Sequence, residues 1–320
     1  MNLVWYRNDL RVAAHSPLQA ALSESSGEAV SGPRALAVYC LCQGQWDRHQ
    51  VAGRGVTAHR PPAGAAERTG SATTHLEHDM NLVWYRNDLR VAAHSPLQAA
   101  LSESSGEAVS GPRALAVYCL CQGQWDRHQV APLRRWYVLE SVRELGEALA
   151  RRGIDLHVLE ADTFAAVPEV LAQFAQEHGV THLYCNREYP LNEKQRDKAV
   201  AERLRGQGVS LQGFDDGVLV PPAALRTGKG TPYTVFGAYK KRWDVWMADH
   251  HPAVTPAPPE SDHRGNFVGA AVVDKALKAL SVPEALTQQW LPGEEAAWQQ
   301  LDQFVEQSLA GYRRLSLIHI

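Results

Sequence analysis

Four short segments hold most of the side chains that could take part in chemistry. Each follows an apolar run and combines aromatic residues with Arg, Asn or carboxylates; they read WYRNDLR, LCQGQWDRH, CNREYPLNE and GFDDGVLVPP. Ligands of open α/β sheets bind beyond the carboxyl ends of the strands, where these segments would lie. We therefore predict one ligand cleft at this edge, the alternative being four ordinary surface loops with capping residues.

Several familiar catalytic signatures are absent. No G-x-G-x-x-G follows the first apolar run, no G-x-S-x-G occurs, and Thr227–Thr231 (TGKGT) lacks the upstream Gly of a phosphate loop. Asp215 and Asp216 are neighbours in an extended segment and point to opposite sides, which favours capping over a shared-proton pair. The Cys-x-Cys pair at Cys119 and Cys121 lacks a second ligand pair, so buried free thiols are expected and not a metal site.

The elements that must position these segments alternate regularly from Met80 onward. Strands are predicted at Leu82–Tyr85, Ala114–Leu120, Asp155–Leu159, Thr181–Cys185 and Ser210–Phe214, and helices at Pro96–Glu103, Pro132–Arg151, Phe164–His178 and Glu193–Arg205. This order predicts an α/β fold, a doubly wound five-stranded parallel sheet with helices on both faces. After Phe214 the alternation stops until one amphipathic helix, which begins at Glu294 and ends before Gly311.

The chain carries its first residues twice, because residues 1–52 recur letter for letter at 80–131. The two copies have the same intrinsic preferences, so the residues after each copy must decide which one folds. The second copy runs into the helix that starts at Pro132, whereas the first runs into a Gly- and Pro-rich spacer that cannot bury an apolar core. We expect the second copy to take its place in the sheet, with the first copy as a competitor for it.

Net charge and the length of the apolar runs limit the partners that the protein can have. The 320 residues carry a net charge of -3, so any nucleic-acid contact must come from a local patch. Lys240, Lys241 and Arg242 beside Trp243 are such a patch, or else one side of an amphipathic helix whose tryptophans are packed. No apolar run approaches the roughly 18 residues of a membrane span, which predicts a cytoplasmic protein without a membrane partner.

Together the segments resemble a known family. WYRNDLR, QWDRH, NREYPLNE-x-x-RD and FDDGVLVPP-x-x-x-x-TG-x-x-x-x-YTVF-x-x-Y, in this order from Met80 to about Tyr312, resemble the N-terminal half of the class I DNA photolyase and cryptochrome family. The resemblance is closest to folate-type bacterial cyclobutane pyrimidine dimer photolyases. It implies an α/β antenna domain, a long connection and a helical FAD domain, in which light energy reaches reduced FAD and an electron then splits the dimer.

The resemblance also implies site residues. His128, Asn192 and Glu193 stand where the family contacts methenyltetrahydrofolate, its antenna pterin, and Tyr312 stands at the first FAD contact of an incomplete site. A carboxylate and an amide can bond the amino-pyrimidinone edge of a pterin. The alternative is that Asn192 and Glu193 only cap the helix they begin. Ala93 and His94 replace the family's usual Asp-Asn pair, so we expect different contacts at that helix start.

The implied organisation has five parts. They are a surplus duplicate at 1–52, a disordered linker at 53–79, the antenna domain at 80–214, a connection at 215–292, and the start of a truncated helical FAD domain at 293–320. The implied function is deoxyribodipyrimidine photolyase acting on pyrimidine-dimer DNA, although we expect this chain alone to be inactive. The alternatives are a cryptochrome-like blue-light sensor and a stand-alone pterin- or nucleotide-binding module. A monomer is expected, with strand swapping or aggregation arising from the duplicate.

Overall fold

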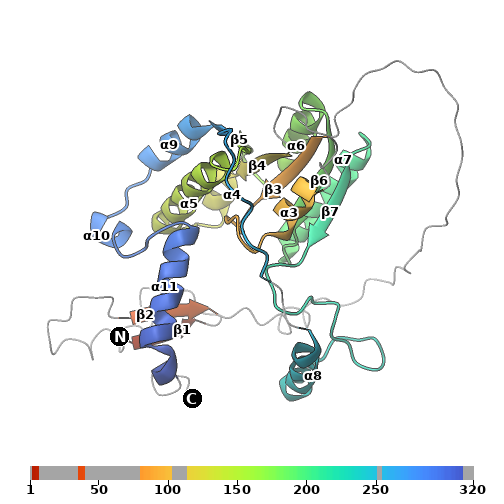
Figure 1. The fold of residues 1–320 in the computed structure, drawn as a ribbon, viewed down its shortest axis with the longest axis vertical. Helices are drawn as coiled ribbons and strands as arrows, with labels where there is room; N and C mark the ends of the chain where they lie inside the picture. Colours follow the sequence, from red (N-terminus) through yellow and green to blue (C-terminus); the bar gives the residue numbers. More distant parts are fainter. Residues whose placement is uncertain (1, 7–34, 40–79, 103–113, 251–253, 313–320) are drawn as a thin grey trace, which may run out of the picture. The chain divides into compact units, whose positions relative to one another are not determined.

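The computed structural model describes residues 2–6, 35–39, 80–102, 114–250 and 254–312 (Figure 1). The chain divides into two units. The larger unit comprises His78–Leu225 and Trp243–Phe304, and the smaller comprises Met1–Glu77, Arg226–Arg242 and Val305–Ile320. The predicted linker at 53–79 and most of the predicted duplicate at 1–52 lie outside the described residues. Within those residues, no helix is both long enough and apolar enough to cross a bilayer.

The larger unit is built on a parallel sheet of six strands. Its spatial order is β7-β6-β3-β4-β5-β8, and every neighbouring pair is parallel. The strands are β3 (Met80–Tyr85), β4 (Ala114–Leu120), β5 (Asp155–Glu160), β6 (Val180–Asn186), β7 (Ser210–Phe214) and β8 (Phe267–Val268). The chain moves outward from β3 to β5 and then returns to place β6 on the other side of β3. The predicted doubly wound parallel sheet is therefore confirmed.

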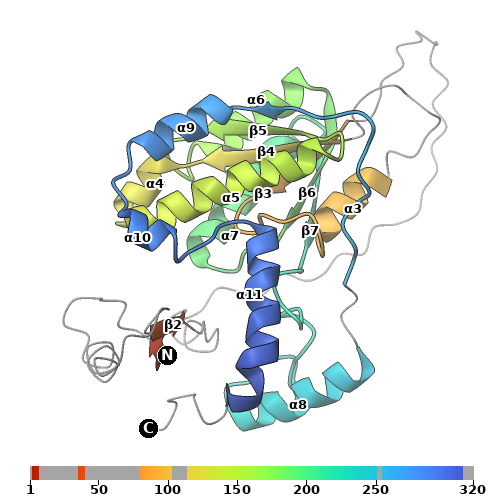
Figure 2. The same cartoon turned by 60° about the vertical axis from the view of Figure 1, so that its left-hand side comes forward.

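Helices cover both faces of this sheet (Figures 1 and 2). The first face carries α3 (Ser95–Ser102), α5 (Pro132–Ala150) and α9 (Ala270–Lys278), and the second carries α6 (Val167–Glu177) and α7 (Leu191–Arg205). In β3, Val83 and Tyr85 pack toward the first face and Leu82 and Trp84 toward the second. All four are buried, which explains why β3 is a continuous apolar run and not an alternation.

The predicted number of five strands was wrong, because the segment after β7 returns to add a sixth. Residues 254–266 run along the end of α5, where Arg152 Nε donates to the Pro258 carbonyl at 2.8 Å and Ser261 N donates to the Arg151 carbonyl at 3.0 Å. β8 then pairs with β5 through Leu156 and Phe267. Two residues give no periodic signal, so this strand exists only through its pairing and through the Phe267 ring against Gly146.

The region after β7 also holds more helix than predicted. Its helices are α8 (Phe236–Asp249), α9, α10 (Glu284–Thr287), α11 (Glu294–Gln307) and the short η2 (Leu309–Gly311). The one helix predicted there, from Glu294, is confirmed as α11. In the larger unit its first residue is fixed to the loop after β3, since the Glu294 carboxylate accepts from Val91 N at 2.7 Å and Ala92 N at 3.1 Å.

The smaller unit contains a two-stranded parallel sheet of β1 (Asn2–Tyr6) and β2 (Ala35–Tyr39). These strands belong to the first copy of the duplicated sequence, and β3 and β4 belong to the second. The second copy is thus the one found in the six-stranded sheet.

A substitution at Gly265 tests how the segment that leads to β8 packs against the end of α5 and the start of β5. A Cβ at this position would lie 2.5 Å from the Ile154 carbonyl oxygen, whereas one at Gly217 would meet nothing within 4 Å. We expect Gly265→Ala to lower the free energy of unfolding by about 1–3 kcal/mol because backbone must move to admit the methyl group. Gly217→Ala should leave the urea midpoint almost unchanged. Equal midpoints for the two variants would contradict this account of β8.

Candidate functional site

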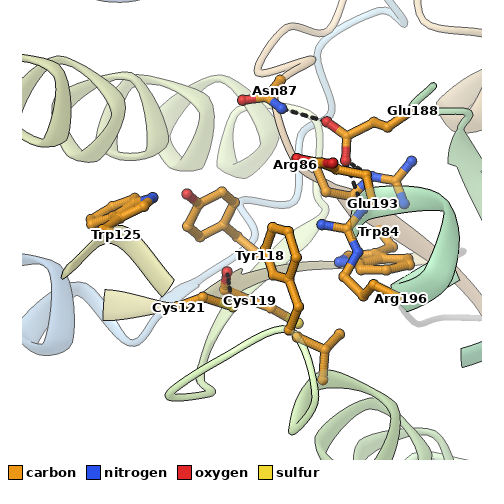
Figure 3. A pocket seen from close by; sticks show the side chains of 12 residues that line it. Trp84, Arg86, Asn87, Tyr118, Cys119, Cys121, Trp125, Glu188, Glu193 and Arg196 are labelled. Carbon is orange, nitrogen blue, oxygen red and sulfur yellow. Dashed lines mark hydrogen bonds and ion pairs between the residues drawn. The ribbon is translucent and has the colours of Figure 1, made fainter. Parts of the chain in front are cut away.

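A hollow opens at the carboxyl ends of β3, β4 and β6, beside α4 (Gln122–Arg127) (Figure 3). Its open side included, it spans about 480 Å³. β6 lies beside β3 at the point where the strand order reverses, the usual place for a ligand in such sheets. Its lining residues are Trp84, Arg86, Asn87, Tyr118, Cys119, Cys121, Trp125, Phe164, Val167, Glu188, Glu193 and Arg196.

One wall of the hollow alternates guanidinium groups with aromatic rings. Arg86 lies over the Trp84 ring at 4.3 Å, and Arg196 lies 4.8 Å from the same ring. Arg196 also lies 4.6 Å from the Phe164 ring. A delocalised guanidinium stacks on a ring face while its edges remain available for hydrogen bonds. The arrangement therefore holds two cations close together on an aromatic support.

Two carboxylates balance these cations. Arg196 Nη2 lies 2.6 Å from Glu188 Oε2 and 2.7 Å from Asp197 Oδ1. Asn87 donates to the other oxygen of Glu188, so this carboxylate joins the ends of β3 and β6. Removing charges from water costs several kcal/mol per ion unless the pairing is close, and this close pairing offsets the cost for Arg196.

Arg86 is held differently. Its side chain is 6% exposed, and Nε, Nη1 and Nη2 have no hydrogen-bond partner among the described residues. Its ion pairs are longer, at 3.6 Å to Asp197 and 4.0 Å to Glu188. Burial works against the charge, but the negative groups around Arg86 outweigh it and raise its pKa above the ordinary value. The wall thus contains a permanent cation whose hydrogen-bonding capacity is unused.

The thiols in the hollow are not reactive groups. Burial raises the pKa of Cys121 to about 11, and burial also raises the pKa of Cys119. Neutral thiols are poor nucleophiles and poor metal ligands at neutral pH. Among the residues that the structure describes, no three His, Cys, Asp or Glu side chains are grouped so as to hold a metal ion.

The loop after β3, which forms the edge of the hollow, is fixed by Asp88. Its Oδ1 accepts from Arg86 N at 2.9 Å, and its Oδ2 lies 2.9 Å from His94 Nε2 and accepts from Asn186 Nδ2 at 2.7 Å. Burial by itself would raise the pKa of Asp88, but the hydrogen bond from His94, together with the charge and the backbone N–H of Arg86, holds it well below its usual range. Asp88 is therefore a largely buried anion with three donors.

His94 performs the capping that the sequence left uncertain. Its Nδ1 accepts from Leu97 N at 3.2 Å, which requires the proton to be on Nε2, facing Asp88. The adjacent Asp216 carboxylate accepts from Ser95 N at 2.6 Å and from Ser95 Oγ at 2.7 Å. The first turn of α3 is thus satisfied without the Asp-Asn pair, although Ala93 must adopt a left-handed φ of 48°.

The chain is similar in sequence to proteins of known family. The model of the DNA photolyase family matches residues 81–260, more than half of the chain. The chain belongs to the DNA photolyase family. It is 37% identical over 186 residues to the deoxyribodipyrimidine photo-lyase of Escherichia coli (strain K12), covering 58% of this chain and 36% of that protein. The chain therefore spans about a third of the length of such photolyases.

Solved structures of photolyases and cryptochromes share the fold. A class III photolyase from Agrobacterium tumefaciens superposes with a TM-score of 0.57 and 23% identity, over 77% of this chain and 48% of that one. The cryptochrome of Synechocystis sp. PCC6803 superposes with a TM-score of 0.53 and 22% identity, over 73% and 47% of the two chains. At this identity the likeness establishes the architecture alone.

Of the four predicted site residues, one lines the hollow and three do not. Glu193 lines the hollow, in the first turn of α7. Asn192 is exposed beside it, and His128 is exposed after α4, with its Nε2 2.9 Å from Gln124 Nε2; neither is among the lining residues. Tyr312 belongs to the smaller unit and is 44% exposed.

Sequence reasoning missed three wall residues, Trp84, Arg86 and Arg196. Trp84 and Arg86 stand in the WYRNDLR segment but carried no assigned role. Arg196 follows Glu193 by three residues, a spacing that places both on one side of a helix. That spacing was the signal that could have added Arg196 to the site.

Asp88→Asn tests the loop after β3. An amide would direct N–H groups at donors, so we expect a loss of about 2–4 kcal/mol in the free energy of unfolding at pH 7. Because the folded pKa of Asp88 is depressed, its stabilisation is present above its ordinary pKa of 3.8 and is lost as the pH falls toward the folded value. Urea midpoints from about pH 6 to about pH 3 should therefore fall less steeply in the variant. Asp126→Asn, at a carboxylate 68% exposed, is the control and should follow the parent protein.

Arg196→Lys tests the stacked wall. An ammonium cannot contact Glu188 and Asp197 together while covering two rings, so we expect a loss of about 2–3 kcal/mol in the free energy of unfolding. Arg203→Lys is the matched control, since Arg203 makes a similar bidentate contact with Glu169 in solvent. Denaturant unfolding should rank Arg196→Lys well below a nearly unchanged Arg203→Lys. If Arg203→Lys lost as much stability as Arg196→Lys, or more, the wall would contribute no more to the free energy of unfolding than a surface ion pair does.

Proposed function

We propose that the larger unit is the light-harvesting part of a DNA photolyase and holds an antenna chromophore at the hollow. The observation that carries this proposal is the combination of aromatic rings and a carboxylate at one place: Trp84, Tyr118, Trp125 and Phe164 line the hollow together with Glu193. Rings of this kind bind a planar heterocycle by stacking, and the carboxylate accepts from its amino and ring N–H groups.

The chromophore we propose is methenyltetrahydrofolate. Glu193 would accept hydrogen bonds from the amino-pyrimidinone edge of its pterin, and Asn192 and His128 would supply the contacts that the family resemblance assigns to them. When bound, the group supplies absorption of near-ultraviolet and blue light. The residues of this chain would orient it and exclude water from its ring faces, which the hollow's aromatic lining favours.

In the whole protein, we propose that the absorbed energy passes to reduced FAD, which splits cyclobutane pyrimidine dimers in DNA by electron transfer. Tyr312 would begin the FAD contacts. Support comes from the family membership of residues 81–260 and from relatives named deoxyribodipyrimidine photo-lyase. These relatives are about three times as long as the matched segment, so the flavin and DNA contacts are proposed for the whole protein and not for the larger unit.

Binding of methenyltetrahydrofolate to the purified chain tests the proposal. We expect a stoichiometric absorption band in the parent protein and binding about 10- to 100-fold weaker in Glu193→Gln, since a hydrogen bond to a charged group contributes about 1.5–3 kcal/mol. Glu202→Gln, at an exposed position of the same helix, should bind like the parent. Absence of a band in the parent, or equal binding by both variants, would contradict the proposed antenna site.

A further inference from the structure

The first copy of the duplicated sequence forms the same strand pair as the second. β1 pairs with β2 from Asn2↔Ala35 to Tyr6↔Tyr39, and β3 pairs with β4 from Asn81↔Ala114 to Tyr85↔Tyr118. Adding 79 to each residue number of the first register gives the second. The two pairs are therefore identical in sequence, direction and register.

Their surroundings differ. β3 and β4 are flanked by β6 and β5, whereas β1 and β2 form a sheet of two strands. The outer edges of that pair make no ladder with any strand in the described residues, and unpaired strand edges are templates for further pairing. The edges that β1 and β2 leave open are those that β3 and β4 use for β6 and β5.

Every polar contact that the rest of the chain makes with the second copy can also be made with the first. Asn186 donates to Asp88, Asp216 accepts from Ser95, and Glu294 accepts from Val91 and Ala92. The corresponding residues of the first copy are Asp9, Ser16, Val12 and Ala13, which are of the same types. No side chain outside the copies distinguishes one from the other.

We propose that β1–β2 exchanges with β3–β4 for the central place in the sheet of the same chain. In this exchanged form, residues 53–131 become an insertion between Ala52 and Pro132. The insertion point is at the surface, since Ala131 and Pro132 are both exposed. Closing a loop of this length disfavours the exchanged form by on the order of 10³-fold, so the second copy prevails in the unsubstituted chain.

A substitution in one copy tests the exchange. Val83 is 0% exposed in β3, and a carboxylate there costs far more than the preference for the second copy. Three full-length chains are compared by circular dichroism and urea unfolding: Val83→Asp, Val4→Asp, and the double variant. We expect Val4→Asp to match the parent, Val83→Asp to unfold cooperatively at a lower midpoint, and the double variant to lack the transition. A Val83→Asp chain as unfolded as the double variant would overturn the proposal.

Thiol labelling shows which copy is in the sheet. Cys121 is buried in the second copy, and Cys42 is its counterpart. Peptides from the two copies are identical, so labelling is measured in chains with either Cys42→Ala or Cys121→Ala, while Cys185 reports overall folding from its own peptide. We expect Cys121 to react slowly in the parent, and Cys42 to become the slow thiol in Val83→Asp. A Cys42 that labels equally fast with and without Val83→Asp would contradict the exchange.

The exchange is proposed within one chain, and size-exclusion chromatography of Val83→Asp separates this from exchange between chains. A folded monomer whose midpoint does not depend on protein concentration supports the proposal. A folded dimer whose midpoint rises with concentration would contradict it. None of these measurements uses a chromophore, so their outcome is independent of the proposed antenna function.

Discussion

Asp88 is a largely buried carboxylate on which the carboxyl edge of the sheet depends. It accepts from the backbone at the end of β3, from Asn186 at the end of β6, and it faces His94 before α3. An anion so largely withdrawn from water is tolerated only when its donors are in place, so it requires these three elements to meet in one arrangement. The same neighbours lower the pKa of Asp88, because they stabilise its charged form.

The consequences extend along the loop after β3. Asp88 sets the tautomer of His94, which allows His94 to cap α3, and Glu294 holds the N–H groups of Val91 and Ala92. The hydrogen bonds of Asp88, Glu294 and His94 fix the loop along its length. They hold Ala93 in its strained left-handed conformation. The edge of the hollow is therefore a defined surface before any ligand arrives, which reduces the entropy that binding must overcome.

The wall of the hollow combines apolar rings with charged groups, although charges are costly where water is excluded. It is aromatic and water-excluding, yet it holds Arg86 and Arg196 beside Glu188 and Asp197. Stacking reconciles the rings with the charges, because both guanidinium groups lie over the Trp84 ring, and that of Arg196 also lies near the Phe164 ring while its edge meets Glu188 and Asp197. Such a wall can accept a flat ring and also fix its orientation, as the proposed antenna site would require.

Much of the fold is determined by the sequence alone. Strands Ala114–Leu120 and Ser210–Phe214 are found at their predicted bounds, and the strand-helix alternation determined a doubly wound parallel sheet. Such predictions succeed because the apolar periodicity of a segment is a property of its local sequence and does not depend on how the element packs. The family resemblance assigns Glu193 to a pterin site, and in the structure Glu193 lines the hollow. Its contact with a pterin stays a prediction.

Tertiary structure alone decided the rest. The two residues of β8 carry no periodicity and become a strand only by pairing with β5. Arg86, Glu188 and Arg196 look like surface charges in the sequence, and they form one largely buried group because parallel strands bring their loops to the same edge. The two copies of the duplicate have identical local preferences, so only pairing with β5 and β6 distinguishes β3–β4 from β1–β2, and pairing is a property of the folded chain.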